Sequence, residues 1–156
     1  MRSAAVVGIG NILRADDGVG VRVIEALERS GFGQDADLYD GGTSPLDMLG
    51  VFVDHEVVVI VDCVRAGGRP GTLYRLTPEE LGSTESSARF AHGVGVVEAL
   101  GLARELGSRA SVVLVGVEPE HTGWSLELSP NVEASVAAVA DLVRGEIERV
   151  AERPVA

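Results

Sequence analysis

The chain has 156 residues, of which 46% are hydrophobic, and it carries a formal net charge of -11. This length and composition are typical of one folded domain, so we expect a single domain over residues 1–156 with a disordered tail from about residue 151. The negative charge disfavours nucleic acid as a partner. All 13 basic residues are arginines, which excludes mechanisms that need a P-loop or Schiff-base lysine.

The sequence lacks the marks of secretion and of membrane insertion. No apolar run is long enough to cross a bilayer, and the first residues do not form a signal peptide. We therefore expect a cytoplasmic monomer with no membrane partner. Cys63 is the only cysteine, so an internal disulfide and a cysteine-based zinc cluster are excluded. We interpret Cys63 as a buried thiol, because no motif places a base beside it.

Strand and helix patterns alternate along the chain. Apolar, β-branched runs predict five strands, at residues 4–9, 36–40, 56–61, 72–76 and 111–117. The fourth of these is typical of an antiparallel edge. Apolar residues at helical spacing predict helices at 21–29, 45–52, 92–106 and 130–150, with a single turn at 78–81. The stretch 82–91 is polar and without period, which predicts a surface loop.

This alternation predicts an α/β fold. We expect a three-layer α/β/α sandwich, in which a mostly parallel, twisted sheet of about five strands has helices on both faces. A strand order of 2-1-3 would bring together the loop that holds Asp17, the turn at residues 40–43 and Asp62. In such sheets, functional sites lie beyond the carboxyl ends of the strands.

The stretch from Gly8 to Gly20, GIGNILRADDGVG, joins the first strand to the first helix and contains two adjacent acids. Asp16 or Asp17 could cap the helix and complement its dipole. Crowding a second carboxylate into one turn favours a nearby cation instead. A dinucleotide-binding loop is the rival interpretation, but Leu13 stands where its third glycine belongs, and the acids would face the pyrophosphate.

Three residues from different parts of the chain make a candidate site: Asp17, Asp62 and His92. Each has an ordinary explanation on its own, as a helix cap, a loop anchor and a surface histidine. Together on one edge of the sheet, two carboxylates and an imidazole would form an open ligand set. Such a set suits a divalent ion such as nickel, zinc or manganese.

Short blocks in a fixed order resemble a known family. They are residues 8–20, DGGT at 40–43, VDCV at 61–64, PG at 70–71, HGVG at 92–95, GVEP at 116–119 and LELSP at 126–130. With these blocks the chain resembles, nearly end to end, the hydrogenase maturation endopeptidases. Those enzymes trim the C-terminal extension of the large subunit of [NiFe] hydrogenases.

The resemblance implies a metal-dependent endopeptidase that acts on a hydrogenase large-subunit precursor. It assigns catalysis and metal contact to Asp17, Asp62 and His92, and it assigns substrate positioning to Gly41, Gly42 and Thr43. The implied metal is nickel carried by the substrate, and no organic cofactor is implied. Many relatives have Glu in place of Asp17, so the shorter side chain here would either draw the metal closer to the backbone or tolerate a different coordination.

Two other functions remain open from the sequence. One is a related peptidase that acts on a different metalloprotein precursor. The other is a non-enzymatic, Rossmann-like module that binds a nucleotide or a metal ion.

Overall fold

The computed structural model describes residues 3–81 and 88–153. Its strands are β1 (Ala4–Gly8), β2 (Asp37–Asp40), β3 (Val57–Arg65), β4 (Leu73–Leu76), β5 (Arg89–Phe90) and β6 (Ser111–Val117). Its α-helices are α1 (Val19–Arg29), α2 (Leu49–Asp54), α3 (Pro78–Leu81), α4 (Gly93–Glu105) and α5 (Pro130–Ala151). Short 3-10 helices lie at Ala15–Gly18, Phe32–Gln34 and Pro45–Met48.

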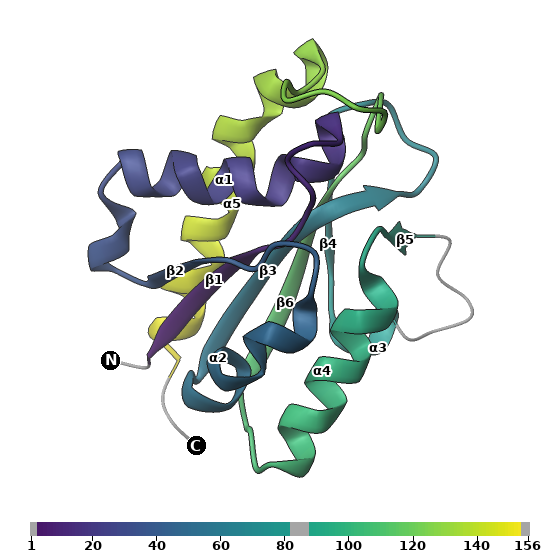
Figure 1. Cartoon of the computed structure of the whole chain (residues 1–156). Coiled ribbons are helices and arrows are strands. Elements are labelled where there is room, and N and C mark those ends of the chain that lie inside the picture. The colour runs from purple at the N-terminus through teal and green to yellow at the C-terminus, as the bar shows by residue number, and fades with distance from the viewer. Residues whose placement is uncertain (1–2, 82–87, 154–156) are drawn as a thin grey trace.

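The sheet has the order β2-β1-β3-β6-β4, with β5 paired to β3 (Figure 1). Strands β1, β2, β3 and β6 are parallel, whereas β4 runs antiparallel to β6 at the edge. The predicted order 2-1-3 and the predicted antiparallel edge strand are therefore confirmed.

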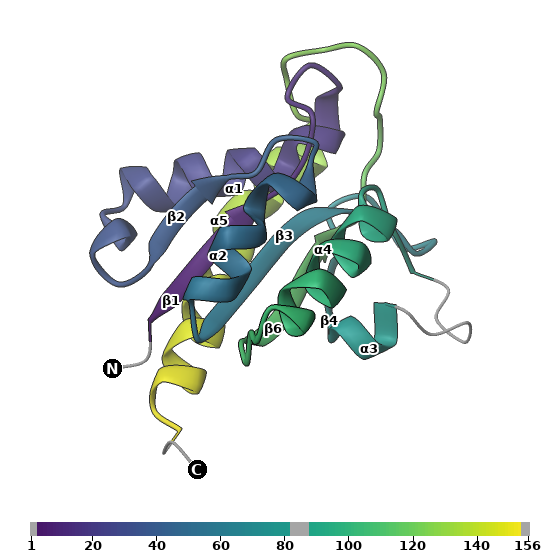
Figure 2. The same ribbon diagram turned by 60° about the horizontal axis from the view of Figure 1, so that its bottom comes forward.

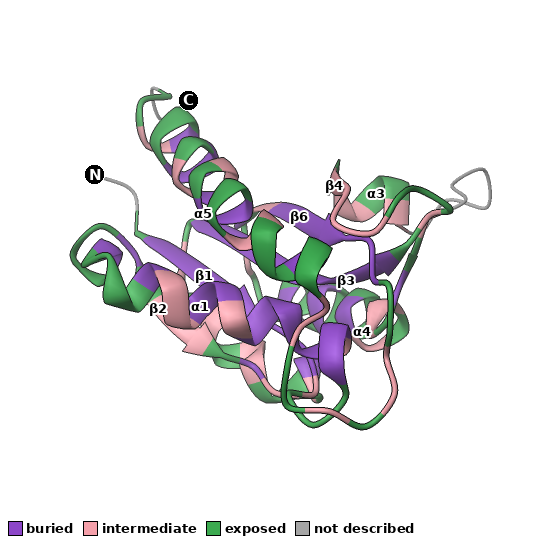
Figure 3. Cartoon of the chain, turned by 90° about the horizontal axis from the view of Figure 1, so that it is seen from above, coloured by how far each residue is buried: buried purple, intermediate pink, exposed green. Residues whose placement is uncertain are grey.

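Helices cover both faces of this sheet. Helices α1 and α5 lie on one face, and α2 and α4 lie on the other (Figures 1 and 2). Successive side chains of β3 point alternately to the two faces of the sheet. Val59 packs in the core beneath α1 and α5, and Ile60 packs in the core beneath α2 and α4. Burial on both faces explains why the central strands are almost continuously apolar (Figure 3). The three-layer α/β/α prediction is confirmed.

Two predicted boundaries differ from the structure. Strand β3 does not end before Asp62, because the ladder with β6 continues through Asp62 and Cys63, and β5 then pairs with Val64 and Arg65. Of the predicted loop at 82–91, residues 82–87 lie outside the described residues, and Arg89 and Phe90 form β5 instead. A strand of two residues has no period for a sequence pattern to reveal.

At the C-terminus, helix α5 ends at Ala151, and residues 154–156 of the predicted tail lie outside the described residues. Within residues 3–81 and 88–153, no helix is both long and apolar enough to cross a bilayer.

Candidate active site

The carboxyl ends of three parallel strands meet at one edge of the sheet. Gly8, the last residue of β1, is in register with Asp40 of β2 and with Val61 of β3. The segments that follow these residues therefore start side by side. They carry Asp17, the turn at 40–43 and Asp62, as the predicted strand order required.

Asp62 and His92 are in direct contact. The Oδ1 atom of Asp62 lies 3.1 Å from Nδ1 of His92 and accepts the backbone N–H of Cys63 at 2.8 Å. Its Oδ2 atom accepts the backbone N–H of His92 at 3.1 Å. His92 occupies the N-cap position of α4, and the Asp62 side chain is fully buried in β3. A proton on Nδ1 satisfies this contact and leaves Nε2 as the second ring nitrogen.

The contact changes the acidity of both groups. Burial raises the pKa of Asp62, and the hydrogen bonds from His92 and Cys63 counter only part of that rise. The hydrogen bond to Asp62 raises the pKa of His92 despite its partial burial, and the charges of Asp62 and Asp17 add to the rise. Both shifts favour a proton held between the two side chains.

Asp17 is half-buried in the 3-10 turn Ala15–Gly18, where its Oδ2 atom accepts the backbone N–H of Asn11 at 3.0 Å. It lines a hollow of about 220 Å³ together with Cys63 and Ala91. The turn needs Gly10, whose φ is 153° and where a Cβ atom would stand 2.1 Å from the Asp17 carbonyl oxygen. This close approach explains why position 10 must be glycine, which the sequence motif alone did not explain.

Cys63 is 2% exposed, and burial raises the pKa of its thiol, helped by the charges of Asp62 and Asp17. Its interpretation as a buried thiol is confirmed. A thiol with a raised pKa is a poor nucleophile because little thiolate forms.

The structure thus brings Asp62 and His92 into contact and places Asp17 close enough for its charge to act on His92. Among the residues described, no group of three or more His, Cys, Asp or Glu side chains converges closely enough to hold a metal ion. The assignment of Asp17, Asp62 and His92 as three ligands of one ion therefore stays a prediction.

Asp16 has a function that the sequence did not reveal. Its side chain is fully buried, and its Oδ2 atom accepts the N–H groups of Glu120 and His121 at 2.9 Å and the Ser129 hydroxyl at 2.7 Å. Its Oδ1 atom accepts the Ser129 N–H at 2.7 Å. The helix-cap interpretation of Asp16 and Asp17 is wrong, because Gly18 is the N-cap of α1 and no side chain caps it. No local pattern could have found partners more than a hundred positions away.

These bonds join the first loop to residues 118–129, and the two segments lie side by side in Figures 1 and 2. Two backbone hydrogen bonds connect the same segments: Ala15 N–H donates to Ser125 O at 2.8 Å, and Asp16 N–H donates to His121 O at 3.0 Å. Ala15 adopts a φ of 48°, a left-handed conformation that is uncommon for alanine and that the surrounding bonds maintain.

The turn at 40–43 is tied to the same loop. Gly42 has a φ of 52°, donates its N–H to Asp40 Oδ1 at 2.9 Å, and accepts the Gly10 N–H at 2.7 Å. A Cβ atom on Gly42 would meet nothing within 4 Å, whereas one on Gly41 would lie 3.0 Å from the Val7 side chain. Thr43 is exposed. The positioning role of Gly41, Gly42 and Thr43 stays a prediction.

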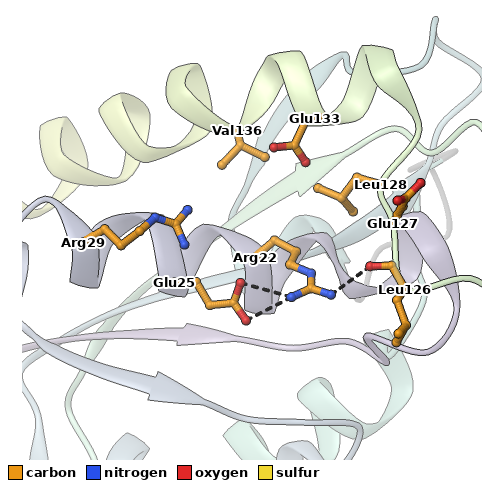
Figure 4. A pocket seen from close by; sticks show the side chains of 8 residues that line it. All are labelled: Arg22, Glu25, Arg29, Leu126, Glu127, Leu128, Glu133 and Val136. Atoms are coloured by element: carbon orange, nitrogen blue, oxygen red, sulfur yellow. Dashed lines mark hydrogen bonds and ion pairs between the residues drawn. The ribbon is translucent and has the colours of Figure 1, made fainter.

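A larger hollow, of about 510 Å³, lies between α1, residues 126–128 and α5 (Figure 4). Arg22 partly fills it, since its guanidinium bonds to Glu25 at 3.1 Å and to the Leu126 carbonyl at 2.9 Å. None of the residues predicted for the site lines this hollow. This hollow therefore lies apart from the residues predicted for the site.

Comparison with known proteins gives a consistent result. Residues 21–146 match the family model described as HycI, hydrogenase maturation protease. The "Hydrogenase 2 maturation protease" of Escherichia coli is 33% identical over 141 residues, covering 88% of this chain and 86% of the relative. The "Hydrogenase expression/formation protein HoxM" of Cupriavidus necator is 38% identical over 148 residues, with 88% and 72% covered.

Solved structures agree with these sequence matches. The hydrogenase maturating endopeptidase HybD from E. coli has a TM-score of 0.80 at 29% identity, covering 95% of this chain and 93% of HybD. The [NiFe] hydrogenase maturation protease HycI from Thermococcus kodakarensis has a TM-score of 0.74 at 25% identity, with 94% and 93% covered.

Proposed function

Because this chain belongs to the hydrogenase maturation protease family, we propose that it removes the C-terminal extension of a [NiFe] hydrogenase large-subunit precursor and recognises the nickel held by that precursor. Its reaction is that of an endopeptidase, a hydrolase. One water molecule adds across a peptide bond, its OH to the carbonyl carbon and its remaining proton to the leaving nitrogen.

The observation that carries the proposal is the contact between Asp62 and His92 beside the hollow that Asp17 lines. With Nδ1 of His92 engaged, Nε2 is the ring nitrogen that can meet a metal ion, and a carboxylate partner commonly orients such a histidine. Asp17 offers a carboxylate oxygen from the neighbouring loop. We therefore propose Asp17, Asp62 and His92 as the nickel-recognising residues, with Asp62 acting through His92 in the conformation described.

Nickel that arrives with the substrate brings ligands of its own. This chain then needs to supply only part of the coordination shell, so its affinity for the free ion should be modest. Gly41, Gly42 and Thr43, on the adjacent turn, would position the substrate near its cleavage point. The reaction needs no organic cofactor.

Proton transfer is the task of Asp17 in this proposal. Asp62 is fully buried and both its oxygens accept hydrogen bonds, whereas Asp17 lines the hollow. Asp17 would take a proton from water as the water oxygen attacks, and would return a proton to the leaving nitrogen. The nickel of the substrate would contribute by polarising the carbonyl group.

The test is to offer the purified protein a precursor produced with nickel and the same precursor produced without it. We expect cleavage of the nickel-loaded form alone. Equal cleavage of both forms, or stoichiometric and chelator-sensitive zinc in the resting protein, would contradict nickel recognition and leave an ordinary metallopeptidase. Cleavage of only a different metalloprotein precursor would favour the related-peptidase alternative.

A further inference from the structure

Two arginines beside the candidate site are held by neutral partners. Arg14 donates from Nε to the Thr122 carbonyl at 3.1 Å, and Arg65 donates from Nη2 to the Thr122 hydroxyl at 2.9 Å. Within residues 3–81 and 88–153, the arginines that pair with a carboxylate, at distances up to 3.9 Å, include Arg22, Arg75, Arg104, Arg144 and Arg149. Arg14 and Arg65 form no ion pair with any residue that the structure describes.

These two arginines enter the same hollow as Asp17. Among the described residues that line it are Arg14, Arg65 and one carboxylate, that of Asp17. The chain as a whole has 24 acidic and 13 basic residues, so a positively charged hollow is contrary to its overall charge. The potential of the whole molecule repels an anionic group, and this hollow is a place where local charge attracts one.

We propose that Arg14 and Arg65 bind a carboxylate group of the precursor's C-terminal extension, a role that rests on the function proposed above. Guanidinium groups recognise carboxylates through paired N–H donors. Both terminal nitrogens of Arg14, and Nε and Nη1 of Arg65, have no hydrogen-bond partner among the described residues. Every extension ends in an α-carboxylate whatever its sequence, and an acidic side chain offers the same chemical group.

The arginines are fixed in place before the substrate arrives. Both bond to Thr122, which follows directly after the two residues whose N–H groups Asp16 accepts. Arg14 also stacks on Trp124, with its guanidinium carbon 5.7 Å from the ring centre. Because less side-chain freedom is lost on binding, such fixed donors bind an anion more tightly than free surface arginines do.

Trp124 makes the proposal measurable without any cleavage. It is the only tryptophan of the chain, it is 78% exposed, and it contacts Arg14. A carboxylate that binds Arg14 should therefore change the tryptophan fluorescence. The probe is a synthetic peptide with the sequence of the extension, titrated into the full chain.

Three peptides and three variants complete the binding experiment. The peptides are the free acid, its C-terminal amide, and a form whose Asp and Glu residues are replaced by Asn and Gln. The variants are Arg65→Gln, Arg65→Lys and, as a matched control, Arg109→Gln. Arg109 is an exposed arginine that precedes the amino end of β6, whereas the hollow lies at the carboxyl ends of the parallel strands. Its replacement therefore removes the same charge at a site away from the hollow.

We expect the free acid to bind, and Arg65→Gln to weaken its binding by at least about tenfold. Arg65→Lys should restore part of the affinity, and Arg109→Gln should not change it. Weaker binding of the amide identifies the chain terminus as the source of the carboxylate, and weaker binding of the neutralised peptide identifies a side chain. No binding of the free acid, or equal binding of all three peptides, overturns the proposal.

A kinetic arm separates this proposal from the proposed function. With nickel-loaded precursor, Arg65→Gln should raise KM and leave kcat nearly unchanged, because the arginine holds the extension and does not touch the scissile bond. An unchanged KM overturns carboxylate recognition while cleavage by the wild type upholds the peptidase. If the wild type does not cleave, the peptidase proposal fails, and the peptide titration still decides the role of the arginines.

Discussion

Asp16 and Asp17 are adjacent in the chain, yet they lie in opposite surroundings. Asp16 is fully buried and accepts four hydrogen bonds from residues 120, 121 and 129. Asp17 is half-buried, accepts one bond from Asn11 and lines the hollow. One turn of chain therefore holds a fully buried carboxylate that joins two loops beside a half-buried carboxylate that lines the hollow. Residue type and position alone do not separate these two roles, whereas hydrogen-bond partners do.

The largest effect should come from Asp16→Asn. An amide cannot accept every bond that the carboxylate accepts, and it leaves buried N–H groups unsatisfied, so we expect a loss of about 3 kcal/mol in the free energy of unfolding. Cleavage should fall too, because residues 118–129 lose their attachment. Urea denaturation measures the change, with the exposed Asp35→Asn as control. Equal stability of Asp16→Asn and wild type would remove the distinction between the two acids.

Asp17→Asn should reverse this pattern. We expect cleavage of nickel-loaded precursor to fall at least about a hundredfold, with a change of less than about 1 kcal/mol in stability. Asp62→Asn should lie between the two, losing cleavage and also about 1 to 2 kcal/mol, since its carbonyl oxygen can still accept but its NH2 group would face one of the two backbone N–H donors, that of His92 or that of Cys63. Normal cleavage by Asp17→Asn would show that this carboxylate has no chemical role.

Gly42→Ala tests whether the turn at 40–43 serves the substrate or only the backbone. The left-handed φ of 52° should cost about 1 kcal/mol with any side chain, although the space around it is open. Gly31→Ala is the matched control, because Gly31 has a φ of 80° and open space beyond the far end of α1. We expect both variants to lose similar stability and only Gly42→Ala to lose cleavage. Equal cleavage by both would leave Gly42 a purely structural residue.

Glu146 extends the comparison to a buried carboxylate outside the candidate site. Its replacement by Gln should have the smallest effect of these predictions. Burial raises the pKa of Glu146, but the hydrogen bonds from Arg75 and Arg149 outweigh burial and lower it below the ordinary 4.5. A carboxyl group whose pKa is lowered by folding stabilises the fold above its ordinary pKa of 4.5. This stabilisation is lost as the pH falls from 4.5 through the lowered pKa.

Wild type should therefore exceed Glu146→Gln in stability by about 1 kcal/mol at pH 7, and the difference should shrink below pH 4.5. Urea titrations from pH 7 to about pH 3 measure it. A difference that stays constant across this range would mean that the packing of Glu146, and not its charge, stabilises the fold.

The strands, their order and the layers could be predicted because the parallel strands have two buried faces and are therefore continuously apolar. The register that places Asp62 near the loop of Asp17 followed from the strand order alone. Strand β5 could not be predicted, because its two residues pair with the end of β3 through a contact that exists only in the folded chain. The length of β3 depended on that contact and on the continued ladder with β6.

Motifs predicted Asp17, Asp62 and His92 as candidate residues, whereas the contacts that distinguish the three were not predicted. Burial of Asp62 and its bonds to His92 depend on how far β3 extends. Asp16 was misread because its partners lie 104 to 113 residues away. The arginines of the hollow were missed for the same reason, since Thr122 connects Arg14 and Arg65 from a distant part of the chain.

The long sequence separation between Asp16 and Ser129 also determines when the hydrogen bonds between them can form during synthesis. A ribosome has already released the first strands while most of α5 is still untranslated, so Asp16 must wait for 113 further residues before its last two bonds can form. Contacts this distant in sequence are also slow to form, because the entropy of closing the long intervening loop is lost before the contact is gained. The loop that contains Asp16 and Asp17 therefore lacks these two bonds until the chain has been synthesised as far as Ser129, where α5 begins.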